Sequence, residues 1–241
     1  MYRIKMAPDV EVKMLKSSFW IDKFKDEILL SAAQIKEFNQ IIYKKAVQEK
    51  KEGYYCDLVQ FAQKPKGDKV SRMIKNTYQR KINAEQNYFN LQGELISPDK
   101  REKIKNNGSP GNLKSKNGRI IKYGMLIRRS NIRALPTEIT YSAGPKTGDQ
   151  NLLQLTALSC GSAVIILAES RDYNWYYVQT KLMRGWVKKD NIVLTDSLDA
   201  ALSYLNSKSF LVVSGSRIET EPNPFAPEIA NRFFQMGDKI P

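Results

Sequence analysis

The chain has 241 residues, of which 41% are apolar, and its 39 Lys and Arg outnumber its 25 Asp and Glu to give a formal net charge of +14. It has no histidine and two cysteines, which excludes catalysis by an imidazole base, imidazole metal sites, Cys-rich zinc sites and a disulfide framework. The composition is that of a globular protein with a sizeable core, for which we expect no cofactor and no metal site.

Positive charge is concentrated in the first half of the chain. Residues 1–123 hold 26 basic and 14 acidic side chains, whereas residues 124–241 hold 13 and 11. The excess is strongest in residues 61–122, where 15 basic residues stand against 5 acidic ones. Such a region attracts a polyanion, which could be nucleic acid, anionic lipid or an anionic cell-wall polymer, or it simply keeps the protein soluble.

Helical patterns dominate residues 1–122. Residues 31–34 (SAAQ) have the form of a capping box, in which a hydroxyl and an amide three residues apart satisfy backbone groups at a helix start. Ile35, Phe38 and Ile42 follow on one face at helical spacing, together with Leu30 and Tyr43. Further helices are predicted over residues 69–82, with Asp68 as a possible cap, and after Ser97.

The periodicity changes after a polar, Gly- and Asn-rich stretch at residues 106–118, which has the composition of a loop or linker. Short β-branched or aromatic runs follow, separated by turn residues such as those at 172–174 (DYN). These predicted strands are residues 120–127, 163–168, 175–179, 185–187 and 192–194. Five short strands in about 70 residues predict a small β-barrel over residues 123–195.

The last part of the chain, residues 196–241, has the pattern of a linker helix followed by the start of a second β unit. Residues 196–209 are predicted to be helical, residues 210–214 (FLVVS) read as a strand, and residues 221–227 form a Pro-rich loop. One or two strands are marginal by themselves. We therefore expect this unit either to dock on the first barrel or to belong to a truncated domain, and the fold class to be α+β.

Residues 123–137 (YGMLIRRSNIRALPT) resemble the entry to the bacterial SH3-like domain, of SH3b1 type, in cell-wall peptidases of the NlpC/P60 family. The resemblance continues through residues 154–158, 161–164, 172–175 and 178, the Gly-Trp-Val triplet at 185–187 and the closing residues 192–194. Residues 18–21 and 31–39 resemble the N-terminal stabilising region of those enzymes. Residues 210–213 and 234–241 resemble the opening half of their second SH3-like domain. The resemblance implies a stabilising region at 1–122, an SH3-like barrel at 123–195 and an incomplete second SH3-like unit at 196–241.

In that family, a papain-like domain with a Cys nucleophile and a His base cleaves γ-D-glutamyl to diamino acid bonds in peptidoglycan peptides. This chain has no histidine, and Cys56 and Cys160 are predicted to be small buried or turn residues. A thiol without a base or an electropositive setting is a poor nucleophile. We therefore assign no catalytic residue and expect this chain alone not to be an enzyme, but a fragment or subunit of a cysteine peptidase.

Ligand binding is instead expected at the barrel. The loop at residues 138–151 would lie beside a binding groove, and arginine side chains bind carboxylates in a bidentate manner. The candidate ligand-binding residues are Tyr141, Asp149, Trp175, Arg128 and Arg129. Trp186 is predicted to belong to the core, and Arg133 to tie the barrel to the N-terminal helices.

The resemblance implies a non-catalytic peptidoglycan-binding and substrate-positioning portion of an NlpC/P60-type endopeptidase. Its partners would be peptidoglycan peptides or an anionic wall polymer and a separate catalytic domain, and its location the periplasm or cell wall. The alternative is a basic nucleic-acid-binding or protein-interaction module built on an SH3-like barrel, although no nucleic-acid motif is present. No stretch is long and apolar enough for a membrane helix. The N-terminus has no apolar segment typical of an export signal, so a cytoplasmic location stays an alternative.

Overall fold

The computed structural model describes residues 9–16, 18–20, 30–48, 56–63, 70–79, 82, 85–109, 122–145, 151–227 and 230–241. It divides into two compact units, Met1–Lys50 and Lys51–Pro241. The helices are η1 (Val12–Leu15), α2 (Ala32–Gln48), α3 (Leu58–Gln63), α4 (Val70–Gln79), α5 (Pro98–Asn107), η4 (Lys189–Asn191) and α6 (Leu198–Leu205). The strands are β1 (Lys122–Leu126), β2 (Ser130–Arg133), β3 (Gln154–Leu158), β4 (Ala163–Glu169), β5 (Trp175–Gln179), β6 (Arg184–Lys188), β7 (Ile192–Thr195), β8 (Leu211–Val212), β9 (Arg217–Glu219), β10 (Phe233–Gln235) and β11 (Lys239–Ile240).

The first unit consists of η1, a short helical turn and α2. The predicted capping box is present, because the Ser31 amide donates to Gln34 Oε1 at 2.8 Å and the Gln34 amide donates to Ser31 Oγ at 3.3 Å. Ile35, Phe38 and Ile42, which form the predicted apolar face, are about half exposed within this unit. The Tyr43 side chain and Asp68 lie outside the described residues.

In the second unit, β1 to β7 form one antiparallel sheet in the order β3-β2-β6-β5-β4-β1-β7. Leu155 of edge strand β3 and Leu194 of edge strand β7 pack against the same buried cluster, which also contains Val164, Tyr176 and Val178. Because both edges face one cluster, the sheet curls around it. Mixed helix and strand content is therefore confirmed, and β2 and β3 add to the five strands predicted from the sequence.

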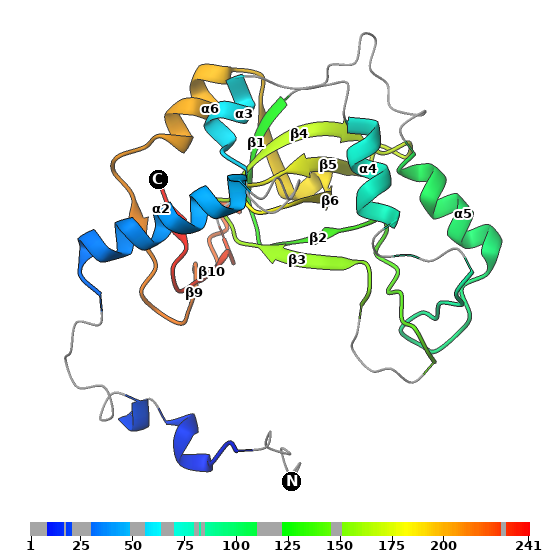
Figure 1. Cartoon of the computed structure of the whole chain (residues 1–241), viewed down its shortest axis with the longest axis horizontal. Coiled ribbons are helices and arrows are strands. Elements are labelled where there is room, and N and C mark those ends of the chain that lie inside the picture. The colour runs from blue at the N-terminus through cyan, green and yellow to red at the C-terminus, as the bar shows by residue number, and fades with distance from the viewer. Residues whose placement is uncertain are drawn as a thin grey trace. The chain divides into compact units, whose positions relative to one another are not determined.

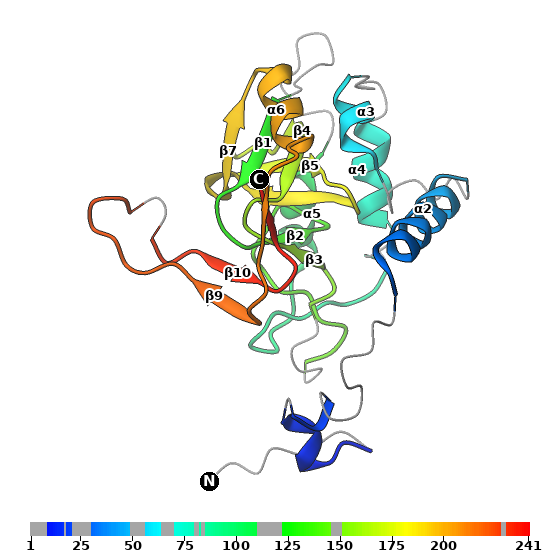
Figure 2. The ribbon, with the colours of Figure 1, turned by 90° about the vertical axis from the view of Figure 1, so that its left-hand side faces the viewer.

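The opposite face of the sheet is also buried. Side chains alternate along a strand, so Trp175 and Tyr177 of β5 point away from the inner cluster and pack in a second one. Figures 1 and 2 show α3 and α6 side by side over one end of the sheet, with α4 near β5 and β6. Val70, Met73 and Ile74 of α4 are buried there, as the helical pattern predicts. Trp186 is fully buried beside Tyr177, at 5.3 Å between ring centroids.

A third buried cluster joins residues 85–109 to the segment that follows β2. Tyr88, Ile96, Leu135, Tyr141 and Leu153 are its principal members. The third predicted helix is α5, which begins after Ser97, whose Oγ accepts from the Lys100 amide at 3.3 Å. The polar stretch from residue 106 was expected to be a loop, but the helix continues to residue 107 because its last turn is capped by the Gly108 amide.

Beyond α6, two short strand pairs complete the described chain. β8 pairs with β11, and β9 pairs with β10 to form a ribbon that projects from the sheet in Figure 2. Phe233 and Phe234 of β10 are half-buried, Ile218 of β9 is exposed, and Phe225 in the connecting loop is 96% exposed. Among the helices of the described residues, none is both long and apolar enough to cross a membrane.

The close contact between β6 and β2 leads to a stability prediction. A Cβ atom added at Gly185 would lie 2.7 Å from the Arg133 carbonyl oxygen and 2.7 Å from Ile132 Cγ1, so strands β2 and β6 would have to separate. We expect Gly185→Ala to lower the free energy of unfolding by about 1–3 kcal/mol, as overpacking does. Urea unfolding followed by circular dichroism measures this change.

Gly215→Ala is the matched control, because its Cβ would meet only the exposed Ile218 side chain, at 3.1 Å. Equal free energies of unfolding for the two variants would show that the β2–β6 contact is looser than described.

Candidate functional site

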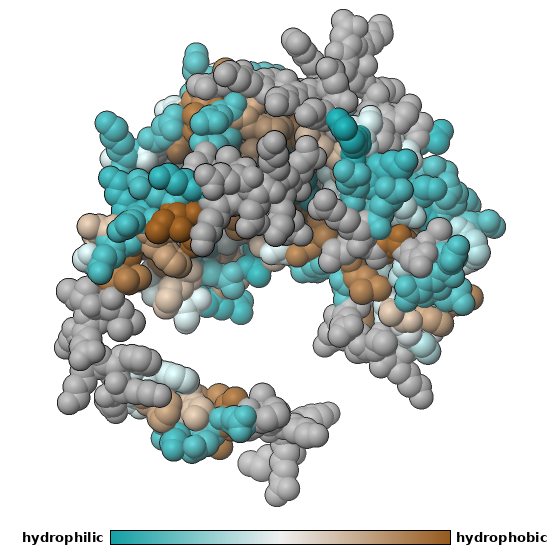
Figure 3. Space-filling model, viewed as in Figure 1, coloured by the Kyte–Doolittle hydropathy of each residue, from teal (hydrophilic) through white to brown (hydrophobic). Residues whose placement is uncertain are grey.

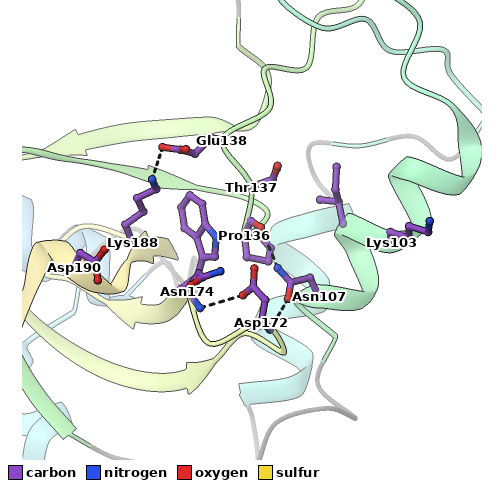
Figure 4. Close-up of a pocket in the computed structure, with 11 residues that line it drawn as sticks. Lys103, Asn107, Pro136, Thr137, Glu138, Asp172, Asn174, Lys188 and Asp190 are labelled. Atoms are coloured by element: carbon purple, nitrogen blue, oxygen red, sulfur yellow. Dashed lines mark hydrogen bonds and ion pairs between the residues drawn. The ribbon is translucent and has the colours of Figure 1, made fainter.

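A pocket of about 490 Å³ lies where four segments of the second unit meet. They are the C-terminal half of α5, the loop that follows β2, the β4–β5 turn, and the end of β6 with η4. The lining residues are Lys103, Ile104, Asn107, Pro136, Thr137, Glu138, Asp172, Asn174, Trp175, Lys188 and Asp190 (Figure 4). Three of the four segments connect or end strands of the sheet, which therefore sets the position of the pocket.

The β4–β5 turn is held by the side chains of Ser170 and Asp172. Ser170 Oγ donates to Asp172 Oδ1 at 2.5 Å and accepts from the Trp175 amide at 3.0 Å. Asp172 Oδ1 also accepts from the Asn174 amide at 3.1 Å. Tyr173, between them, has a φ of +61°, a left-handed conformation that Asp and Asn neighbours support through such bonds. The tight connection predicted at residues 172–174 is confirmed.

Asn107, the last residue of α5, ties the helix to two other walls of the pocket. Its Oδ1 accepts from the Asp172 amide at 2.9 Å, and its carbonyl accepts from the Arg171 amide at 2.9 Å. Its Nδ2 donates to the Pro136 carbonyl at 3.3 Å. Figure 4 shows Asn107 and Asp172 facing each other in this arrangement. Asn107 was not among the predicted site residues; the signal was a carboxamide directly before the glycine that ends a helix.

Charged groups of both signs surround the pocket. Lys188 Nζ pairs with Glu138 Oε1 at 2.7 Å, while Lys103 lies on α5 and Asp190 on η4. Partial burial favours the neutral form of Asp172, but the hydrogen bonds from Ser170, Asn174 and Asn107 outweigh it and lower the pKa of this carboxyl. The pocket therefore combines the ionised Asp172 carboxylate with lysine side chains, an arrangement suited to a ligand that carries both charges.

Of the predicted ligand-binding residues, Trp175 lines this pocket. It is 5% exposed, so the indole forms part of the wall while most of it belongs to the core. Tyr141 lies elsewhere and is 1% exposed, with its ring packed on that of Tyr88 at 5.4 Å between centroids. It was expected at the edge of a groove, but the third cluster buries it. Asp149 lies outside the described residues.

Arg128 and Arg129 are exposed between β1 and β2, away from the pocket. The Arg129 guanidinium donates to Gln235 Oε1 and stands over the Phe233 ring, 5.9 Å from its centroid. These two contacts of Arg129 therefore link the β9–β10 ribbon to the sheet. Arg133 was expected to contact the N-terminal helices, but Nη2 of its buried guanidinium donates to the Ile139 carbonyl at 2.8 Å and holds the segment after β2.

The two thiols have the environment of structural cysteines. Burial raises the pKa of Cys56 to about 11, against a smaller lowering by Arg184. Burial also raises the pKa of Cys160, which lies in the turn before β4. A thiol with a raised pKa is protonated at neutral pH, and the protonated form is a poor nucleophile.

The model of a protein family described as an SH3 domain of SH3b1 type matches residues 149–188. The chain contains an SH3b1-type domain. The match covers β3 to β6 and includes four lining residues of the pocket, namely Asp172, Asn174, Trp175 and Lys188. No curated protein matches the chain.

A solved structure of an NlpC/P60 endopeptidase from Photobacterium damselae subsp. piscicida resembles this chain with a TM-score of 0.59 and 16% sequence identity. The likeness covers 71% of this chain and 37% of the endopeptidase chain. At this identity it shows a shared fold. The SH3b1-type domain and its surroundings therefore have the fold of part of such an endopeptidase, as the sequence resemblance indicated.

The hydrogen bonds on Asp172 predict how stability depends on pH. Because its pKa is lower in the folded state, its contribution to stability is complete above the ordinary pKa of 3.8 and is lost as the pH falls through the folded value. We expect Asp172→Asn to reduce the loss of stability between about pH 5 and pH 2, measured by urea unfolding. Ser170→Ala, which removes one of the donors, should reduce it in part; identical pH profiles for all three proteins would contradict the assignment.

Proposed function

We propose that this chain is a non-catalytic wall-binding and substrate-positioning portion of an NlpC/P60-type γ-D-glutamyl–diamino acid endopeptidase. Bacterial SH3 domains are typical of proteins that act at the cell wall, so the periplasm or cell wall is the proposed location. The observation that carries the proposal is that four of the eleven residues lining the mixed-charge pocket belong to the SH3b1-type segment. Peptidoglycan peptide is its proposed ligand.

The chemistry of the pocket supports a peptide ligand. A wall peptide has carboxylates and an amino group on a short, partly apolar backbone. Lys103 and Lys188 offer ammonium groups to its carboxylates, and Asp190 offers a carboxylate to its amino group. Asn174 presents a carboxamide that can bond to peptide groups, and Trp175 supplies an apolar wall.

Long-range attraction to anionic wall polymers adds to this local recognition. The surface over α5 is mostly hydrophilic in Figure 3, and Lys100 and Lys103 of this helix are exposed. Interactions between exposed charges more than about 8 Å apart are largely screened at physiological ionic strength. Binding to the wall should therefore weaken as salt is added, while recognition in the pocket should be less sensitive.

Hydrolysis is assigned to a separate catalytic domain, because this chain has no histidine and both thiols have raised pKa values. In this proposal the SH3b1-type domain presents the peptide, and the partner domain cleaves it. Incubation of soluble muropeptides with this chain alone should release no peptide.

A pair of charge reversals tests recognition in the pocket. Lys103→Glu and Lys208→Glu change the net charge equally, but Lys208 is exposed between α6 and β8 and does not line the pocket. We expect Lys103→Glu to weaken binding of a soluble muropeptide about tenfold, because a hydrogen bond to a charged group contributes about 1.5–3 kcal/mol, and Lys208→Glu to leave it unchanged. Isothermal titration calorimetry measures both affinities.

Two outcomes would count against the proposal. Equal weakening by both substitutions would mean that total charge, and not the pocket, determines binding. Tighter and more salt-dependent binding to duplex DNA than to muropeptides would favour the nucleic-acid alternative.

A further inference from the structure

A second cavity, of about 170 Å³, lies on another side of α5 and shares no lining residue with the pocket beside Trp175. Its walls come from α4, α5 and the segment after β2. They include Tyr78, Ile82, Arg101, Lys105, Leu135 and Tyr141. One water needs about 10–15 Å³ of such space, so this cavity has room for a small organic molecule.

The Tyr141 hydroxyl is the unusual group in this cavity. The side chain is 1% exposed, and among the described residues its oxygen has no hydrogen-bond partner. The backbone is well anchored, because the Tyr141 carbonyl accepts from the Leu152 amide at 2.8 Å. Other buried tyrosines are paired: the Tyr177 hydroxyl lies 2.7 Å from Thr77 Oγ1, and that of Tyr123 donates to the Ala62 carbonyl at 3.2 Å. A buried hydroxyl without a partner costs folding free energy.

The charges around this hydroxyl are predominantly positive. Arg101, Lys105 and one acidic residue, Glu102, line the cavity, and Glu102 pairs with Lys105 Nζ at 3.0 Å. Burial raises the pKa of Tyr141 to about 12, with Tyr78 adding to this rise and Arg101 opposing it. The phenol is therefore protonated at neutral pH and acts as a donor. Tyr141 lines this cavity together with Tyr78 and Arg101, two of the groups that act on its ionisation.

We propose that this cavity binds a small organic carboxylate with a short apolar body. The Tyr141 hydroxyl donates to one carboxylate oxygen, and the two positive charges of Arg101 and Lys105 outnumber the single carboxylate of Glu102 and favour the anion. Ile82 and Leu135 contact the apolar body. This site is independent of the proposed peptide pocket, so either proposal can fail without the other.

N-acetylalanine is a suitable probe, and N-acetylalaninamide is its neutral counterpart of the same shape. We expect N-acetylalanine to shift the ring resonances of Tyr141 in the full chain labelled with ¹³C-tyrosine, with a Kd in the millimolar range typical of so small a ligand, and the amide to bind much more weakly. Tyr141→Phe should weaken binding about tenfold, followed through the Tyr78 resonances, because it removes one hydrogen bond to a charged group.

Thermal unfolding separates this role from a structural one. Tyr141→Phe removes a hydroxyl without a partner, so its melting temperature should stay unchanged or rise by about 2–4 °C. Tyr177→Phe, the matched control, removes a paired hydroxyl and should melt at a lower temperature. A lowered melting temperature for Tyr141→Phe, equal binding of acid and amide, unchanged affinity in Tyr141→Phe, or no shift with millimolar N-acetylalanine would each overturn the proposal.

Discussion

Burial of both faces of one curled sheet is the constraint on which the rest of this structure depends. Every residue of β5 is buried, because Tyr176 and Val178 face the inside of the sheet while Trp175 and Tyr177 pack against the outer cluster. A sheet with two apolar faces needs covering elements, and α3, α4 and α6 provide them. The helices are thus a second layer of the same core.

Hydrogen bonds position α5 more than apolar contacts do. None of its residues is buried, yet Asn107 joins it to the β4–β5 turn and to the loop after β2. A polar helix held in this way leaves space on its flanks. The pocket beside Trp175 and the cavity beside Tyr141 both use side chains of α5, and they differ in chemistry because different residues of the helix face each one.

Buried polar groups reveal which parts of the fold serve packing and which are open to a ligand. Burial of the Arg133 guanidinium lowers its pKa. The group still has a clear structural role, because it donates a hydrogen bond to the Ile139 carbonyl. The Tyr141 hydroxyl is also buried, but it has no hydrogen-bond partner among the described residues. Such differences are invisible in composition, since Arg133 and Tyr141 lie only eight positions apart in the chain.

The sequence by itself determined the local elements: the capping box at Ser31, the start of α5 at Ser97, and strand β5, because each depends on neighbouring residues whose spacing is visible in the chain. It also indicated the SH3b1-type domain through a pattern spread over that domain. Only the tertiary structure decided that Trp175 lines a pocket and Tyr141 is buried. Both outcomes depend on contacts with residues distant in the chain, such as Tyr88 against Tyr141, and no local pattern encodes which of two similar aromatic side chains will be covered.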